Sequence, residues 1–197
     1  DEVEAGNVAI LGVPYDEQSS FMCGPALAPA RIRQVLASGE TNLAAERGLD
    51  LGTERRLVDV GDVDPGRGIM ALDKIEGTAN KLLDRGARIL ALGGDHAITL
   101  PIIRAYGKRT PDLVILQFDA HPDLYDEFDG NRYSHACPFA RIMEEGLVAR
   151  LVQVGVRTAN PHQRAQAERF GVQTIEMRHW QPGQVLAFGG PLYLSVD

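Results

Sequence analysis

The stretch DLVILQFDAHPD, residues 112–123, joins an apolar run to three polar side chains at alternate positions. The run is rich in Val, Ile and Leu, which is typical of a strand buried on both faces of a parallel sheet. Where the run ends, Asp119, His121 and Asp123 stand two residues apart. Alternate residues of an extended segment project to one side, so these three side chains can reach a common point. An imidazole and two carboxylates in that arrangement predict a metal site.

Similar apolar runs recur along the chain and alternate with segments of helical period, which indicates a parallel sheet covered by helices. Strands are predicted at residues 7–13, 56–61, 87–92, 112–118, 150–156, 172–176 and 191–197.

One helix is predicted from apolar residues that recur every three or four positions and stop before Gly86. These residues are Leu72, Ile75, Ala79 and Leu82. Three more helices are predicted at 29–36, 140–146 and 161–170, each with Pro near its start or Gly near its end. Without a linker, a repeat or a low-complexity tract, the chain is expected to form a single domain over residues 1–197.

Composition excludes several classes of function. The net charge of −7, with basic residues scattered among acids, disfavours nucleic acid as a partner. No apolar stretch approaches the roughly 20 residues that cross a bilayer, so we expect no membrane association and a cytoplasmic location. Cys23 and Cys137 lie far apart in sequence and are expected to be reduced thiols. The chain stops inside an apparent strand at Asp197, so we expect it to be truncated at the C-terminus.

Three of the predicted strands run directly into possible metal ligands, which are Asp95, His96, Asp119, His121, Asp123 and Asp197. In a parallel sheet these strand ends share one edge, where ligands usually bind. Carboxylates crowded at such an edge repel one another unless cations lie between them. Oxygen-rich ligands with imidazole and without thiolate favour Mn²⁺ among the divalent ions. For Asp95 we expect a structural role instead, as the cap of a helix that starts near Ala97.

With these residues in view, the sequence resembles the ureohydrolases, the arginase and agmatinase family. The resemblance covers nearly the whole chain, in the family's order, and is closest to agmatinase-type members. It rests on the segments GVPYD (12–16), GPALAPARIR (24–33), ALGGDHAITLP (91–101), FDAHPDLYD (118–126), YSHACPFARIMEEG (133–146), QVGVR (153–157) and YLSVD (193–197). The implied fold is the arginase–deacetylase fold, a three-layer α/β/α sandwich with a mainly parallel sheet, whose C-terminal part is missing from this chain.

The resemblance also implies roles for individual residues. One manganese ion would be held by His96, Asp119, Asp123 and Asp197, and a second by Asp119, His121 and Asp197. His135 matches the family histidine that transfers protons, a task that suits an imidazole near neutral pH. The implied reaction is the hydrolysis of a guanidino carbon–nitrogen bond, a linear amidine, to urea and an amine. Agmatine, giving putrescine, is the first expected substrate, and the implied assembly is a homo-oligomer, a trimer or hexamer.

The sequence departs from the family at its end. The family has a second metal-binding aspartate two residues beyond the position of Asp197, and later a glutamate that holds the guanidinium, and neither is present here. Three alternatives therefore stay open. The first is a guanidinobutyrase or another guanidino or formimino hydrolase, and the second is a catalytically inactive fragment or subunit. The third is a thiol mechanism at Cys137 with a histidine base.

The segment between Leu124 and Tyr133 is expected to shape the pocket for the substrate's tail. Its acidic residues Asp126, Glu127 and Asp129 suit an amine tail, but they suit a solvated loop equally well.

Overall fold

The computed structural model describes residues 3–197 and contains two compact units, one that ends at Ile98 and one that runs from Thr99 to Asp197. Each unit has its own sheet, and every strand pairing in both sheets is parallel. The parallel α/β class predicted from the sequence is therefore confirmed. The expected single domain over residues 1–197 stays a prediction.

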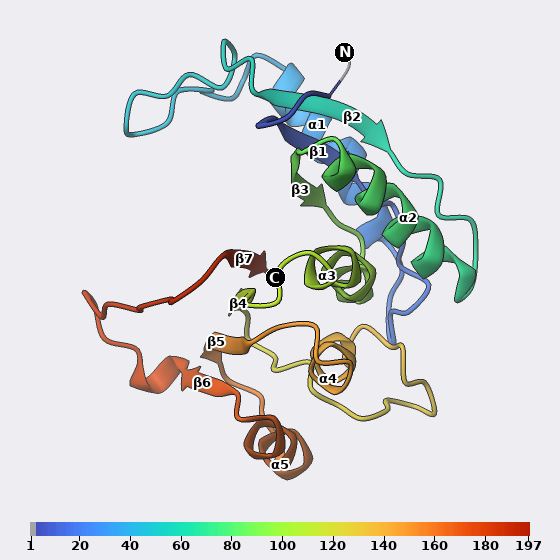
Figure 1. The fold of residues 1–197 in the computed structure, drawn as a ribbon, viewed down its shortest axis with the longest axis vertical. Coiled ribbons are helices and arrows are strands. Elements are labelled where there is room, and N and C mark those ends of the chain that lie inside the picture. Colours follow the sequence, from blue (N-terminus) through green and yellow to red (C-terminus); the bar gives the residue numbers. More distant parts are fainter. Residues whose placement is uncertain (1–2) are drawn as a thin grey trace. The chain divides into compact units, whose positions relative to one another are not determined.

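The first unit contains a three-stranded sheet in the order β2-β1-β3 (Figure 1). Its elements are β1 (Val8–Gly12), η1 (Pro25–Leu27), α1 (Ala28–Ala37), β2 (Leu57–Asp62), α2 (Met70–Asp84), β3 (Arg88–Leu92) and η2 (His96–Ile98). The apolar residues that recur every three or four positions form the buried face of α2, where Leu72, Ile75 and Ala79 are each at most 2% exposed. Burying that apolar stripe is what attaches the helix to its unit.

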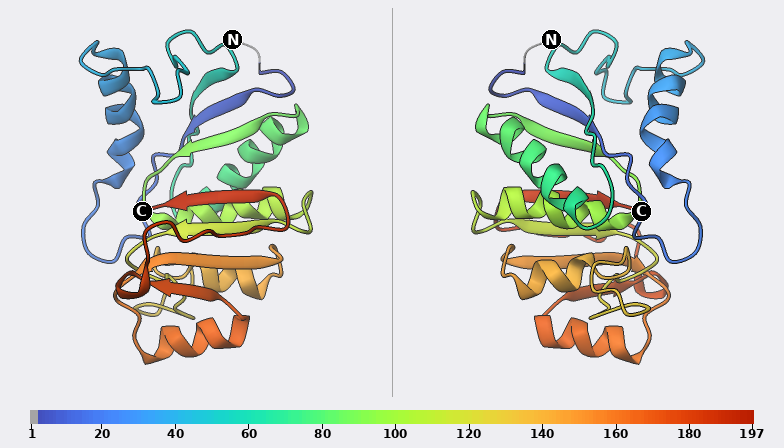
Figure 2. Two further views of the ribbon diagram at one scale, coloured as in Figure 1. Left: turned by 90° about the vertical axis from the view of Figure 1, so that its left-hand side faces the viewer. Right: turned by 90° about the vertical axis from the view of Figure 1, so that its right-hand side faces the viewer.

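The second unit contains a four-stranded sheet in the order β6-β5-β4-β7 (Figure 2). Its elements are α3 (Thr99–Gly107), β4 (Val114–Phe118), α4 (Pro138–Glu144), β5 (Arg150–Val156), α5 (Pro161–Phe170), β6 (Gln173–Glu176), η3 (Met177–His179) and β7 (Leu192–Val196). The last strand in the sequence, β7, pairs with β4 and not with β6, the strand that precedes it. Phe118 of β4 stands opposite Val196 of β7. Strand ends that are 78 positions apart along the chain therefore lie side by side.

Two apolar clusters hold the second unit together, one on each face of its sheet. On one face the helices α3, α4 and α5 supply side chains such as Ile103, Phe139 and Phe170. On the other face Val114 and Val152 of the strands pack against Trp180 in the segment that follows β6. Burial on both faces explains why β4 and β5 read as continuous apolar runs instead of alternating patterns.

Helix α5 shows how local sequence sets the ends of an element. The side chain of Asn160 accepts a hydrogen bond from the Gln163 N–H at 2.9 Å, Pro161 occupies the first helical position, and Gly171 closes the helix with a left-handed φ of 63°. The predicted range 161–170 is therefore confirmed at both ends. No helix within residues 3–197 combines the length and the apolar character that crossing a bilayer requires.

The core of the second unit can be tested at Ile115, which lies in the middle of β4 and is fully buried. We expect Ile115→Ala to lower the free energy of unfolding by about 2–5 kcal/mol, because it removes buried methyl groups and leaves a cavity. Urea denaturation measures this. The matched truncation Val185→Ala, at a side chain that is 88% exposed, should change stability by less than about 0.5 kcal/mol. Equal effects of the two substitutions would contradict the assigned core.

Candidate metal centre

Three carboxylates meet where β4 and β7 end. Asp119 is the first residue after β4 and Asp197 the first after β7, and the Asp197 N–H donates to the Phe118 carbonyl at 3.0 Å. Asp123 returns to the same point, so that one carboxylate oxygen from each aspartate lies within 4.8 Å of the others. Asp119 and Asp123 are each only 6% exposed. The structure thus brings together three of the residues predicted as metal ligands.

The Asp119 carboxylate is held from two sides. Its Oδ1 accepts a hydrogen bond from the His121 N–H at 2.7 Å, and its Oδ2 accepts one from Gln117 Nε2 at 2.8 Å. Gln117 in turn accepts a hydrogen bond through Oε1 from Gln153 Nε2, at 2.7 Å. Both glutamines are fully buried and stand opposite each other in the register of β4 and β5. They form a ladder of amides beneath the carboxylates, which fixes the orientation of Asp119.

Sequence reasoning missed this ladder, although a signal for it exists. Gln117 and Gln153 each interrupt an otherwise apolar run, LVILQF and RLVQVGV. A buried amide without partners is costly, so a glutamine in the middle of a fully buried strand indicates a polar network nearby. Gln153 completes that network by donating a second hydrogen bond to the Pro122 carbonyl at 2.6 Å.

A bulge in β5 gives the Asp119 backbone the space it needs. The register shifts between Val154 and Val156, and Gly155 has a φ of 96°, which disfavours a side chain. A Cβ atom on Gly155 would lie 3.3 Å from the Asp119 carbonyl oxygen. Just beyond the bulge the Arg157 N–H donates to the Ala120 carbonyl at 2.8 Å. The segment after β4 is therefore attached to β5 at its base.

Asp119 and Asp197 line a pocket of about 400 Å³ in the second unit. The pocket is lined by Phe118, Asp119, Ala120, Val154, Gly155, Arg157, Met177, Trp180, Val196 and Asp197. Its walls are mostly apolar, and the polar groups gather at the strand ends, as in many small-molecule sites. Two carboxylates on the wall of one pocket attract a cation or a cationic ligand.

The remaining predicted site residues occupy different surroundings. His121 is exposed, and its Nδ1 lies 3.3 Å from Asp119 Oδ1, so its imidazole is beside the carboxylates. His135 is half-buried, in the turn that leads into α4. His96 belongs to η2 in the first unit. The metal-binding roles of all these residues, and the proton transfer at His135, stay predictions.

Asp95 has the structural role expected for it. It is 6% exposed, its Oδ1 accepts from the Ala97 N–H at 3.0 Å, and its Oδ2 accepts from the Gln18 N–H at 2.9 Å. The preceding Gly94 has an ordinary φ; it is required because a Cβ atom there would collide with the Tyr15 backbone. Close backbone packing therefore requires a glycine at this position.

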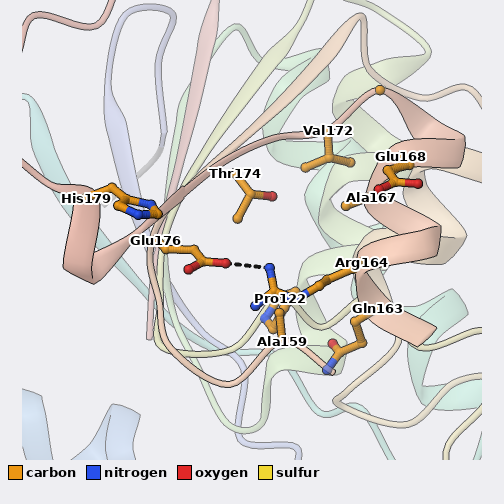
Figure 3. A pocket seen from close by; sticks show the side chains of 11 residues that line it. Pro122, Ala159, Gln163, Arg164, Ala167, Glu168, Val172, Thr174, Glu176 and His179 are labelled. Carbon is orange, nitrogen blue, oxygen red and sulfur yellow. Dashed lines mark hydrogen bonds and ion pairs between the residues drawn. The ribbon is translucent and has the colours of Figure 1, made fainter. Parts of the chain in front are cut away.

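A larger pocket, of about 510 Å³, lies between α5 and β6 in the second unit (Figure 3). Arg164 and Glu176 form an ion pair across it, and the hydrogen bond from Arg164 lowers the pKa of the Glu176 carboxyl. His179 is on its wall, and none of the predicted metal ligands is. His162 accepts a hydrogen bond from the Asp126 N–H at 3.2 Å and stacks on Tyr125.

Comparison with known proteins agrees with these features. The chain is 48% identical to an arginase of Glycine max over 180 residues, which are 87% of this chain and 51% of that protein. It is 32% identical to an agmatinase of Bacillus anthracis over 200 residues, which are 98% of this chain and 68% of that protein. The solved arginase from Medicago truncatula superposes with a TM-score of 0.82 at 43% identity, covering 88% of this chain and 57% of that one.

The chain spans about half the length of the curated arginases that it matches. A model of the arginase family matches residues 6–197, which is almost all of the sequence. This match includes both units, the carboxylates after β4 and the one after β7. The chain therefore belongs to the arginase family.

Proposed function

We propose that the protein containing this chain is a binuclear manganese amidinohydrolase that releases urea from a small guanidino compound. The observation that carries the proposal is the group of three carboxylates within 4.8 Å at the ends of β4 and β7, beside a pocket, in a chain of the arginase family. Asp119, Asp123 and Asp197 would hold the ions, with His96 and His121 completing the ligands. When bound, such ions would make a water molecule acidic enough to act as a nucleophile near neutral pH.

The residues of the chain supply orientation and proton transfer. The ladder of Gln153 and Gln117 fixes the direction of the Asp119 oxygens before any ligand arrives, so that no reorganisation is needed on binding. In this proposal His135 holds the proton that the departing amine receives, since an imidazole exchanges protons readily near neutral pH.

For the substrate we propose arginine first and agmatine second. The relatives near 48% identity are named arginases, whereas the match to an agmatinase is weaker in identity but extends over 98% of the chain. In the structure the acidic residues of the loop from 124 to 133 support agmatine less than they do in the sequence alone. The Asp126 carboxylate lies 2.8 Å from both Arg132 and Arg141, and the hydrogen bond from Arg141 lowers the pKa of this carboxyl. Its charge is therefore already paired with two arginines, which weakens its attraction for an amine tail.

Urea release tests the reaction and the substrate together. The full-length protein with Mn²⁺ should release urea from arginine with the highest kcat/KM and from agmatine with a lower one. Urea release from guanidinobutyrate, and from neither arginine nor agmatine, would show that the substrate has been assigned wrongly. No urea from any guanidino compound, with Mn²⁺ bound, would favour the inactive subunit instead. The cytoplasmic location and the trimeric or hexameric assembly stay predictions.

The metal site is tested by Asp119→Asn in the full-length protein. We expect Mn²⁺ affinity, followed by electron paramagnetic resonance of the free ion, to fall by more than the roughly 10–100-fold that is typical for loss of an outer-shell partner. The reason is that an amide carries no charge and is a poor ligand for this ion. Asp112→Asn is the matched control, since Asp112 lies before the other end of β4 and is exposed. If Asp112→Asn weakens Mn²⁺ binding equally, the carboxylates are not the site.

The alternative thiol mechanism is tested at the two cysteines. Cys137 is fully buried, and burial raises its pKa to about 12, so at pH 8 only about one part in ten thousand is the reactive thiolate. Cys23 is exposed. Iodoacetamide at pH 8 should therefore modify Cys23 and leave Cys137 unmodified, with urea release unchanged, as peptide mass mapping and a urea assay will show. Inactivation that accompanies alkylation of Cys137 while Mn²⁺ stays bound would favour the thiol mechanism.

A further inference from the structure

A buried arginine on α4 holds the long loop that separates two predicted site residues. Arg141 is 3% exposed. Its NH1 donates to the Asp126 carbonyl at 2.6 Å and to the Arg132 carbonyl at 3.3 Å, and its NH2 donates to Asp126 Oδ1 at 2.8 Å. Asp126 is near the start of the loop and Arg132 near its end. One guanidinium therefore bonds both arms of the loop (yellow, before α4, in Figure 1).

The charges around Arg141 form a closed ring. Arg132 lies 2.8 Å from Asp126 and 3.0 Å from Glu144, and Arg141 lies 2.8 Å from Asp126 and 2.9 Å from Glu144. Two cations thus alternate with two anions, and their charges cancel. Because Arg141 is buried and multiply bonded, its geometry is fixed more firmly than that of an exposed ion pair. The ring joins the loop to α4 through both of the loop's arms.

The loop itself is ordered. Phe128 and Asn131 exchange both of their backbone hydrogen bonds, at 3.1 and 3.0 Å, around a turn in which Asp129 and Gly130 have φ values of 52° and 76°. Asp-Gly with two positive φ angles is the usual composition of a tight hairpin turn. At the base of the loop the Tyr125 N–H donates to the Ala136 carbonyl at 3.1 Å. The segment is thus a small hairpin and not an irregular coil.

The two ends of this hairpin carry predicted site residues. Asp123 precedes it with a φ of 47°, an uncommon conformation that persists where the surroundings enforce it. The Phe139 N–H at the start of α4 donates to the Asp123 carbonyl at 3.3 Å. His135 follows the hairpin, six residues before Arg141. Moving the hairpin relative to α4 would therefore move a carboxylate and an imidazole of the proposed site.

We propose that Arg141 is a positioning residue for the hydrolase: through Asp126 and Arg132 it fixes the hairpin, and thereby places Asp123 and His135. This rests on the proposed function for its effect on turnover. Its effect on the loop does not depend on that function. Lysine cannot replace it, because an ammonium on a flexible stem lacks the planar set of donors that bonds two carbonyls and the Asp126 carboxylate at once.

The test is Arg141→Lys in the full-length Mn²⁺ protein, with hydrogen exchange of residues 124–135 and steady-state kinetics on arginine and agmatine as readouts. We expect exchange in this segment to rise about tenfold or more, because the hairpin loses its attachment. At saturating Mn²⁺, kcat should fall by about 10–100-fold while KM changes less than about threefold, because the reacting groups move and the pocket for the tail does not. Asp126→Asn keeps an acceptor but removes the charge. It should also raise hydrogen exchange and lower kcat, each by less than Arg141→Lys does.

Arg33→Lys is the matched control. Arg33 also bonds two carboxylates, those of Asp59 and Asp62, and one carbonyl, that of Gly61, but its partners all belong to the first unit. The Arg33→Lys variant should keep both the hydrogen exchange of residues 124–135 and kcat within about twofold of the parent protein. The proposal is overturned if Arg141→Lys also stays within that range, or if both lysine variants lose activity and loop protection equally. If the parent protein releases no urea at all, the proposed function fails, and the exchange comparison alone decides the role of Arg141.

Discussion

The structure depends on the crowding of like charges at the tips of two neighbouring parallel strands. Carboxylate oxygens of Asp119, Asp123 and Asp197 lie within 4.8 Å of one another. At an effective dielectric constant of about 20, two unit charges at that distance repel by about 3 kcal/mol, and somewhat less where exposed Asp197 is one of them. Three such pairs amount to a large part of the roughly 5–15 kcal/mol that keeps a domain folded. A cation between the carboxylates, or a proton on one of them, would relieve this repulsion.

Parallel pairing makes this crowding possible, and buried amides make it specific. Because β4 and β7 run in the same direction and in register, the residues that follow them are adjacent without any special loop. Adjacency alone leaves the carboxylates free to rotate. The hydrogen bond from Gln117 removes that freedom for Asp119, and Gln153 satisfies Gln117 in turn. An apolar residue at position 117 would leave Asp119 Oδ2 without this hydrogen bond, and only the His121 N–H would then orient the carboxylate.

Much of this could be predicted from the sequence, because the signals are local. All seven strands, the buried stripe of α2 and the ends of α5 follow from periodicity and capping residues. The partners in the glutamine ladder could not be predicted, since a single amide in an apolar run indicates a polar network without naming its members. The loop from 124 to 133 was expected only to shape a pocket, although its Asp129-Gly130 turn is a local signal for a hairpin. The bonds of Arg141 join residues 15 and 9 positions apart, and no periodic pattern encodes them.

The ring around Arg141 also separates two tasks that the acidic loop seemed to combine. Its two cations and two anions neutralise one another, so Asp126 gives the hairpin position and adds no net attraction for a ligand. In the proposed function the strand-end carboxylates hold the ions, and they would act in the same way on every guanidino compound. We therefore expect discrimination between tails to follow from where the hairpin places its remaining groups. A loop fixed in this way selects by geometry, because a misplaced tail cannot be accommodated by moving the loop.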